Sequence, residues 1–154
     1  MSIPPNIDLF NRFCLAVFEK LYLSFPCPLD IDVSNLMMSV IPIGTASEEA
    51  IWNDLDIGGP AIEFLAAEGF LVYQGAPNGN QFMQVRLTMK GLVVLLGSVP
   101  DSLEKHEPLI SKILSITSKG LKEAASDQVN ELSHQAFAFA LASVSTLAAA
   151  IVRI

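Results

Sequence analysis

The stretch AIEFLAAEGFLVYQGAPNGNQFMQVRLTMKGL, residues 61–92, decides the fold of this 154-residue chain. A short apolar helix is predicted to have Pro60 at its first position, where the missing N–H group of proline costs nothing. Gly69 follows where a left-handed residue would end that helix. Two alternating segments, 70–74 and 82–87, flank the turn sequence GAPNGN and predict a β-hairpin.

The second predicted strand leads directly into another helix. Met83, Val85 and Leu87 are expected to share one packed face, because side chains alternate along a strand. Thr88 is then expected to cap a short helix that ends at Gly97. The stretch therefore predicts helix, hairpin and helix in that order.

Upstream of the hairpin, the spacing of apolar residues predicts three more helices. The first is expected over residues 7–23 as an amphipathic helix with one broad buried face. Two shorter helices are expected before residue 57. The side chains expected to cap the three helices are Asn6 or Asp8, then Asp30 or Asp32, then Ser47.

A further element within this region is a Leu-Thr-x-Lys-Gly-Leu segment after the hairpin. Together with the helix, turn and strand order, it resembles the winged-helix superfamily as seen in bacterial regulators, over about residues 7–97. The resemblance implies that residues 60–68 take the place of a DNA-recognition helix and residues 75–81 that of the wing tip. The residues of the segment are Leu87, Thr88, Lys90, Gly91 and Leu92.

The charge of the chain argues against binding to nucleic acid. The net charge is -7, and residues 1–100 hold ten acidic against four basic residues. The expected recognition helix carries Glu63 and Glu68 but no base. Because Lys and Arg supply most of the affinity for phosphates, an acidic face is a poor DNA-binding surface. A DNA-binding dimer would have to use Arg12, Arg86 and Lys90.

The chain is expected to divide into a winged-helix-like domain, residues 1–98, and a C-terminal helical region, residues 99–154. This region predicts two helices, or one long helix bent near Gly120. Residues 132–152 form a segment without formal charge that is long enough to span a bilayer. Alanines and hydroxyl side chains keep the hydropathy of this segment moderate. Two destinations are open: a protein interface or a membrane.

A helix–helix interface is favoured by the spacing within the tail. Apolar residues recur every three or four positions, and a ridge of small residues runs beside them, as in closely packed helices. The tail is therefore expected to pack against another helix, either of the same chain or of a second copy, and self-association is the interpretation adopted. The expected interface residues are Phe137, Leu141, Val144, Ala148 and Ile151, and the small ridge is Ala138, Ala142, Thr146 and Ala150.

No catalytic, cofactor-binding or metal-binding motif is predicted. His106 and His134 lie far apart in the sequence with no partner at a metal-ligand spacing, and Cys14 is expected to be buried in a helix. The N-terminus lacks the pattern of a signal peptide, so a cytoplasmic location is expected.

The function that the sequence favours is a non-catalytic interaction or regulatory protein. It would self-associate through its apolar C-terminal helix and would use its own acidic surface to bind a protein partner. Two alternatives stay open: a dimeric DNA-binding transcription regulator, and a tail-anchored membrane protein whose acidic domain faces the cytosol.

Overall fold

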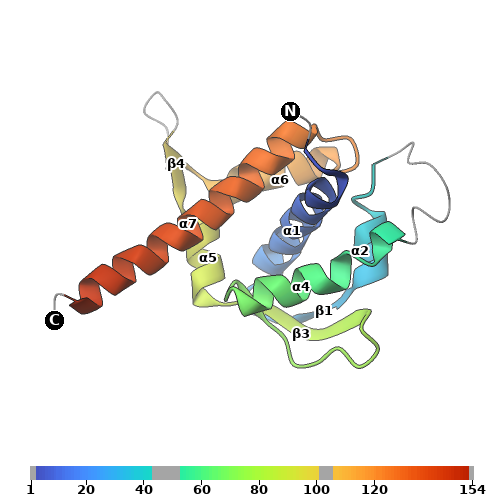
Figure 1. Ribbon diagram of the computed structural model, residues 1–154, viewed down its shortest axis with the longest axis horizontal. Coiled ribbons are helices and arrows are strands. Elements are labelled where there is room, and N and C mark those ends of the chain that lie inside the picture. Colours follow the sequence, from blue (N-terminus) through green and yellow to red (C-terminus); the bar gives the residue numbers. More distant parts are fainter. Residues whose placement is uncertain (1–2, 43–52, 101–105, 153–154) are drawn as a thin grey trace.

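The computed structural model describes residues 3–42, 53–100 and 106–152, and of residues 98–100, 106 and 143–152 it describes the backbone alone. The protein is mainly helical, with a small three-stranded antiparallel sheet (Figure 1). The helices are α1 (Pro5–Ser24), α2 (Val33–Met38), α4 (Gly58–Ala67), α5 (Met89–Leu96), α6 (Leu109–Lys119) and α7 (Ser126–Val152). The strands are β1 (Leu29–Asp32), β2 (Leu71–Val72), β3 (Gln81–Leu87), β4 (Ser98–Pro100) and β5 (His106–Pro108).

Helix α1 forms the centre of the core. It contacts α2, α4, α6, α7 and β3, and residues 11–18 are all buried. The prediction of one broad buried face was therefore too narrow, because neighbours cover this helix on several sides. The predicted cap was also wrong: Pro4 stands at the N-cap position without a side-chain hydrogen bond, and Asp8 pairs instead with Arg12.

The sheet has the strand order β1-β3-β2, so the predicted hairpin gains a third strand that the sequence analysis did not identify. Val85 pairs with Leu29 and Phe82 with Ile31, which places a bulge between them. Gln84, at φ 56°, adopts the left-handed conformation within this bulge.

The bulge corrects the predicted alternation of β3. Val85 and Leu87 are buried as expected, but Phe82 is also buried, whereas Met83 is only half-buried. An extra residue in one strand reverses the faces on the two sides of the bulge, so period-two alternation fails across it. The strand thus places Phe82 and Val85 in the same core.

Helix α4 begins two residues earlier than predicted. Gly58 is its first residue, and Pro60 lies third. Proline is tolerated there because the first N–H groups of a helix have no intrahelical acceptor. A side chain at Gly58 would overlap Val33 and Met37 on α2, so glycine allows the two helices to approach closely. Gly69 ends the helix at φ 85°, as predicted.

Around α2 and α5, local capping follows the sequence. Asp32 accepts a hydrogen bond from the Asn35 N–H at 3.1 Å, which confirms it as the cap of α2. The Thr88 hydroxyl accepts from the Gly91 N–H at 3.0 Å, and Gly97 ends α5. The helix predicted after Ser47 falls largely on residues 43–52, outside the described residues.

The C-terminal region contains two separate helices, which Gly120 divides at φ 102°. The β4–β5 hairpin precedes them and had no clear sequence signal. Helices α6 and α7 pack against α1 and α5, and residues such as Leu109, Ile113 and Val129 belong to the same core as α1. Beyond this contact, α7 projects away from the body of the molecule (Figure 1).

Candidate interaction surfaces

The exposed face of α4 combines acidic and apolar side chains. Glu63, Ala67 and Glu68 are exposed, and Phe64 keeps 45% of its surface in solvent. The Phe64 ring lies edge-on to Phe10 of α1 at a centroid distance of 5.5 Å, so the buried side of this exposed ring packs against α1. This helix covers residues that were expected from the sequence to take the place of a recognition helix, and none of its residues is basic.

An aromatic cluster joins α1, α4 and α7 beneath this face. Phe137 stacks on Phe10 at 6.0 Å, and its ring edges meet Phe64 at 6.4 Å and Phe70 at 5.5 Å. Phe137 is therefore half-buried within its own chain. It was predicted as an interface residue of the tail, but its ring is largely engaged in intramolecular packing.

The loop between β2 and β3 is tied to the body of the protein. Asn80 accepts hydrogen bonds through Oδ1 from the Ser34 N–H at 3.1 Å and the Ser34 hydroxyl at 2.6 Å, and its amide donates to Asp32 at 3.2 Å. Asn78 accepts from the N–H groups of Asn80 and Gln81. The loop's asparagine side chains are thus used to hold its own conformation.

The three basic residues of the DNA-binding alternative, Arg12, Arg86 and Lys90, differ in their exposure to solvent. Arg12 is 3% exposed, pairs with Asp8 at 2.8 Å, and donates to the Leu121 carbonyl and to Ser126 Oγ. A guanidinium so enclosed cannot reach a phosphate, so the assignment of Arg12 as a DNA contact was wrong.

Arg86 and Lys90 lie nearer the surface. Arg86 is exposed on β3 and donates to the Leu87 carbonyl at 3.3 Å. Lys90 donates to the Glu68 carbonyl at 2.7 Å and lies over the Phe70 ring, 5.5 Å from its centroid. Lys90 thus places a positive charge at the C-terminal end of α4, where the free carbonyls carry partial negative charge and favour a cation.

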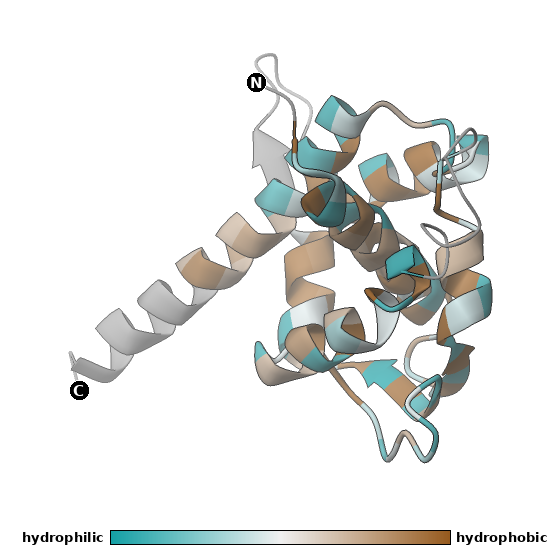
Figure 2. Ribbon diagram, turned by 45° about the vertical axis from the view of Figure 1, so that its right-hand side comes forward, coloured by the Kyte–Doolittle hydropathy of each residue, from teal (hydrophilic) through white to brown (hydrophobic). Residues whose placement is uncertain are grey.

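The projecting part of α7 begins with an exposed leucine. Leu141, which belongs to the predicted interface set, is 71% exposed. Figure 2 shows hydrophobic colouring along the ribbon of this helix where it leaves the body. Val144, Ala148 and Ile151 lie on the helical backbone, but their side chains fall outside the described set.

Membrane crossing was the other destination considered for this helix. Among the residues that the structure describes, none of the helices has both the length and the hydrophobicity required to span a bilayer.

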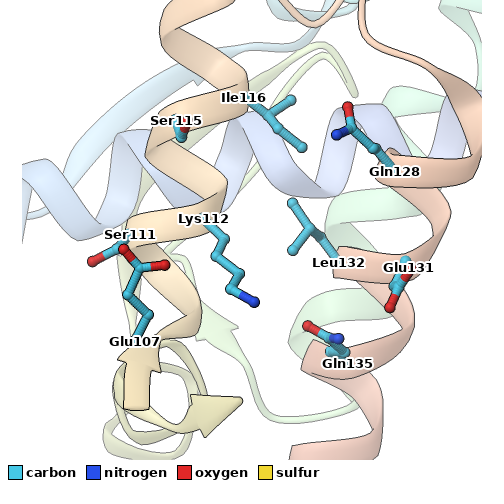
Figure 3. A pocket seen from close by; sticks show the side chains of 9 residues that line it. All are labelled: Glu107, Ser111, Lys112, Ser115, Ile116, Gln128, Glu131, Leu132 and Gln135. Carbon is cyan, nitrogen blue, oxygen red and sulfur yellow. The ribbon is translucent and has the colours of Figure 1, made fainter. Parts of the chain in front are cut away.

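A pocket of about 380 Å³ lies between α6 and α7 (Figure 3). Its apolar wall is Ile116 and Leu132, and Lys112 extends into it from α6. Helix α7 contributes three polar residues at positions i, i+3 and i+7, which lie on one helical face. The sequence analysis missed this pocket, although the polar spacing on α7 was visible: Gln128, Glu131 and Gln135.

The cysteines and histidines show no arrangement for catalysis. Burial raises the pKa of the Cys14 thiol well above its ordinary value, which keeps the thiol protonated. Cys27 and His134 are exposed. Within the described part of the chain, no three His, Cys, Asp or Glu side chains lie close enough together to hold a metal ion.

Comparison with known proteins found no match. The chain matches no family model, no curated protein and no solved structure.

Proposed function

We propose that the chain is a non-catalytic interaction module of winged-helix type, which self-associates through the projecting part of α7 and binds a protein through the face of α4. The element order supports the winged-helix part, since α1, β1, α2, α4, β2 and β3 follow one another with the sheet order β1-β3-β2. In this arrangement α4 takes the place of the recognition helix.

The observation that carries the proposal is the chemistry of α4. An exposed aromatic ring, Phe64, lies between Glu63 and the acidic C-terminal end of the helix at Glu68. Phosphates would be repelled by these carboxylates, whereas an apolar anchor with a charged rim is typical of protein interfaces. A partner with basic side chains around an apolar pocket would complement this face.

Self-association is supported by the apolar character of the projecting helix. Leu141 is already 71% exposed, and the sequence beyond it contains further large apolar residues. Leaving each such side chain in water forgoes about 1.5–3 kcal/mol of burial free energy. Pairing of two α7 helices would recover much of this, and the small-residue ridge would allow close approach.

The solution mass of the full chain in detergent-free buffer tests self-association. We expect a discrete oligomer by light scattering, and a shift toward monomer for Leu141→Glu, because a carboxylate would be buried in the helix pair. Leu23→Glu is the matched control, since Leu23 is also highly exposed, at 66%, but lies on α1. A monomeric wild-type chain at high concentration would refute this part of the proposal.

Removal of the projecting part of α7 is a second test of self-association. A cut before Leu132 would remove core residues such as Ala136 and Ala140, so the cut is made after Ala142, beyond the last core residue among the described side chains. The shortened chain is expected to stay folded and to lose self-association.

Fluorescence anisotropy with a labelled duplex tests the choice between DNA and protein. At about 10 μM protein and low salt, where non-specific DNA-binding domains bind, we expect no increase in anisotropy. Salt-sensitive binding that Arg86→Glu and Lys90→Glu abolish would favour the DNA-binding alternative.

A photoreactive residue tests the α4 face directly. Placed at Ala67, which is exposed on α4, it is expected to give a discrete heteromeric adduct in cells. The same residue at Lys122, in the exposed loop before α7, is the control. Identical adducts from both positions would argue against a specific role of α4.

A further inference from the structure

Helix α5 exposes a row of large apolar side chains, Met89, Val93 and Leu96, which we call the α5 stripe. Met89 keeps 70% of its surface in solvent, and the other two are about half exposed. Their spacing of i, i+4 and i+7 places all three on one face of the helix. Single exposed apolar residues are common on soluble proteins, whereas a continuous group of them is typical of an interaction site.

The tail of the same chain cannot cover the α5 stripe. Helix α7 is continuous from Ser126 to Val152, and it packs against the end of α5, where a Cβ on Gly97 would lie 3.0 Å from the ring of Phe139. Beyond this contact, α7 runs away from the body (Figure 1). A helix rises about 1.5 Å per residue, so residues 143–152 extend about 15 Å outward without turning back.

We propose that a second copy of the chain covers the α5 stripe with residues 143–152 of its own α7. This inference rests on the proposed self-association and names the surface to which the tail binds. Because α5 lies beside the point where α7 leaves the body, two copies with antiparallel α7 helices each bring their projecting segment to α5 of the other. A twofold axis closes this exchange, so both copies bury the same surfaces.

The size of a stable interface favours this arrangement over contact between the two tails alone. Standard protein interfaces use about 20–30 residues from each partner. The projecting segment covers only positions 143–152, and a helix presents one part of its circumference to a neighbour. Adding the α5 stripe extends the interface from the tail to the body of each copy.

The two surfaces also match in chemistry and in side-chain size. The segment SVSTLAAAIV, residues 143–152, carries no formal charge and includes three successive alanines. The α5 stripe is apolar as well, but consists of large side chains. Large side chains on one helix pack into the grooves beside small side chains on another. A second copy brings this segment in equal numbers, so every stripe has one tail to cover it.

Photo-cross-linking between two copies tests the location. A photoreactive residue replaces Met89 in an unlabelled chain, which is equilibrated with a ¹⁵N-labelled wild-type chain until native mass spectrometry detects mixed oligomers. We expect adducts that join position 89 to residues 143–152 of the labelled copy. The same photoreactive residue at Met38, an exposed methionine on α2, is the control and should give no such adduct.

Val93→Glu tests the contribution of the stripe to affinity. It is expected to raise the dissociation constant of the oligomer, measured by light scattering, at least about tenfold, because an apolar contact is lost and a carboxylate must be desolvated. Ile7→Glu is the matched control, since Ile7 is a β-branched residue of similar exposure on α1. Circular dichroism checks the fold. If Val93→Glu unfolds, Met89→Glu repeats the test, because an acid at the first position of α5 favours the helix.

The outcomes separate this inference from the proposed self-association. If Leu141→Glu dissociates the oligomer while Val93→Glu does not, and position 89 gives no adduct with the labelled tail, the α5 site is overturned and self-association stands. Equal effects of Val93→Glu and Ile7→Glu also overturn the α5 site. A monomeric wild-type chain at high concentration overturns both.

Discussion

Arg12 on α1 donates a hydrogen bond to Ser126 Oγ at the start of α7, over 3.0 Å and across 114 positions of sequence. The same guanidinium bonds to Asp8 and to the Leu121 carbonyl, so one buried side chain connects α1 with the α6–α7 connection. The C-terminal helices are thereby attached to the central helix by polar contacts as well as by apolar packing.

Arg12→Met is expected to lower the free energy of unfolding by about 3 kcal/mol, because it leaves the carboxylate of Asp8 without its charge partner. Urea unfolding measures the loss. Adding Asp8→Leu to Arg12→Met should recover part of it, since the unpaired charge is then removed. A loss below about 0.5 kcal/mol would place Arg12 among surface pairs that contribute little.

Thr88→Val is expected to destabilise the protein by about 1–2 kcal/mol, because the hydroxyl caps α5. It accepts from the Gly91 N–H at 3.0 Å and donates to the Gly69 carbonyl at 2.5 Å. Thr88→Ser keeps the hydroxyl and should stay close to wild type. Equal midpoints of the two variants in thermal unfolding would show that the cap contributes little.

Gly91→Ala is expected to cost about 1–3 kcal/mol, because overpacking forces a backbone shift. A Cβ at this position would overlap the Phe70 carbonyl oxygen, against which the start of α5 packs. Gly75→Ala is the control, since a Cβ there meets nothing within 4 Å. Similar unfolding free energies for both variants would contradict the close approach of α5 to Phe70.

The two cysteines are expected to differ in reactivity. Cys27 is exposed and should react with a thiol reagent in the native protein, whereas Cys14 should react only after unfolding. Two rapidly reacting thiols in the native state would contradict the burial of Cys14.

Burial of Cys14 also predicts a dependence of stability on pH. Its pKa is raised above 9.0 in the folded protein, so the contribution is fully present below the unfolded thiol pKa. As pH rises past that value, the unfolded chain loses the proton first, and stability falls by up to about 1.4 kcal/mol per pH unit. Cys14→Ala should show a smaller loss between pH 8 and pH 10; an equal loss would contradict this assignment.

The Leu-Thr-x-Lys-Gly-Leu segment illustrates how sequence and structure divide the explanation. Its threonine caps α5, its lysine binds the end of α4, and its glycine admits the Phe70 carbonyl. The capping role could be predicted because it involves residues three positions apart. The contacts of Lys90 with α4 could not, because they depend on how two helices pack.

The candidate surfaces show the same division. The acidic character of α4 and the apolar character of the tail are visible in composition. That Phe137 is half-buried while Leu141 is exposed depends on where α7 leaves the body. Only the packing of α7 against α1, α5 and the ring of Phe70 decides this.

By itself, the sequence determined the short-range elements: the helical periodicity of α1, the cap Thr88, a cap at Asp30 or Asp32, and the left-handed Gly69. Each depends on hydrogen bonds and steric limits within a few residues. Tertiary structure alone decided the third strand β1, the bulge at Gln84 and the burial of Arg12. These arise from partners tens of positions away, whose meeting depends on the whole core and leaves no local pattern in the chain.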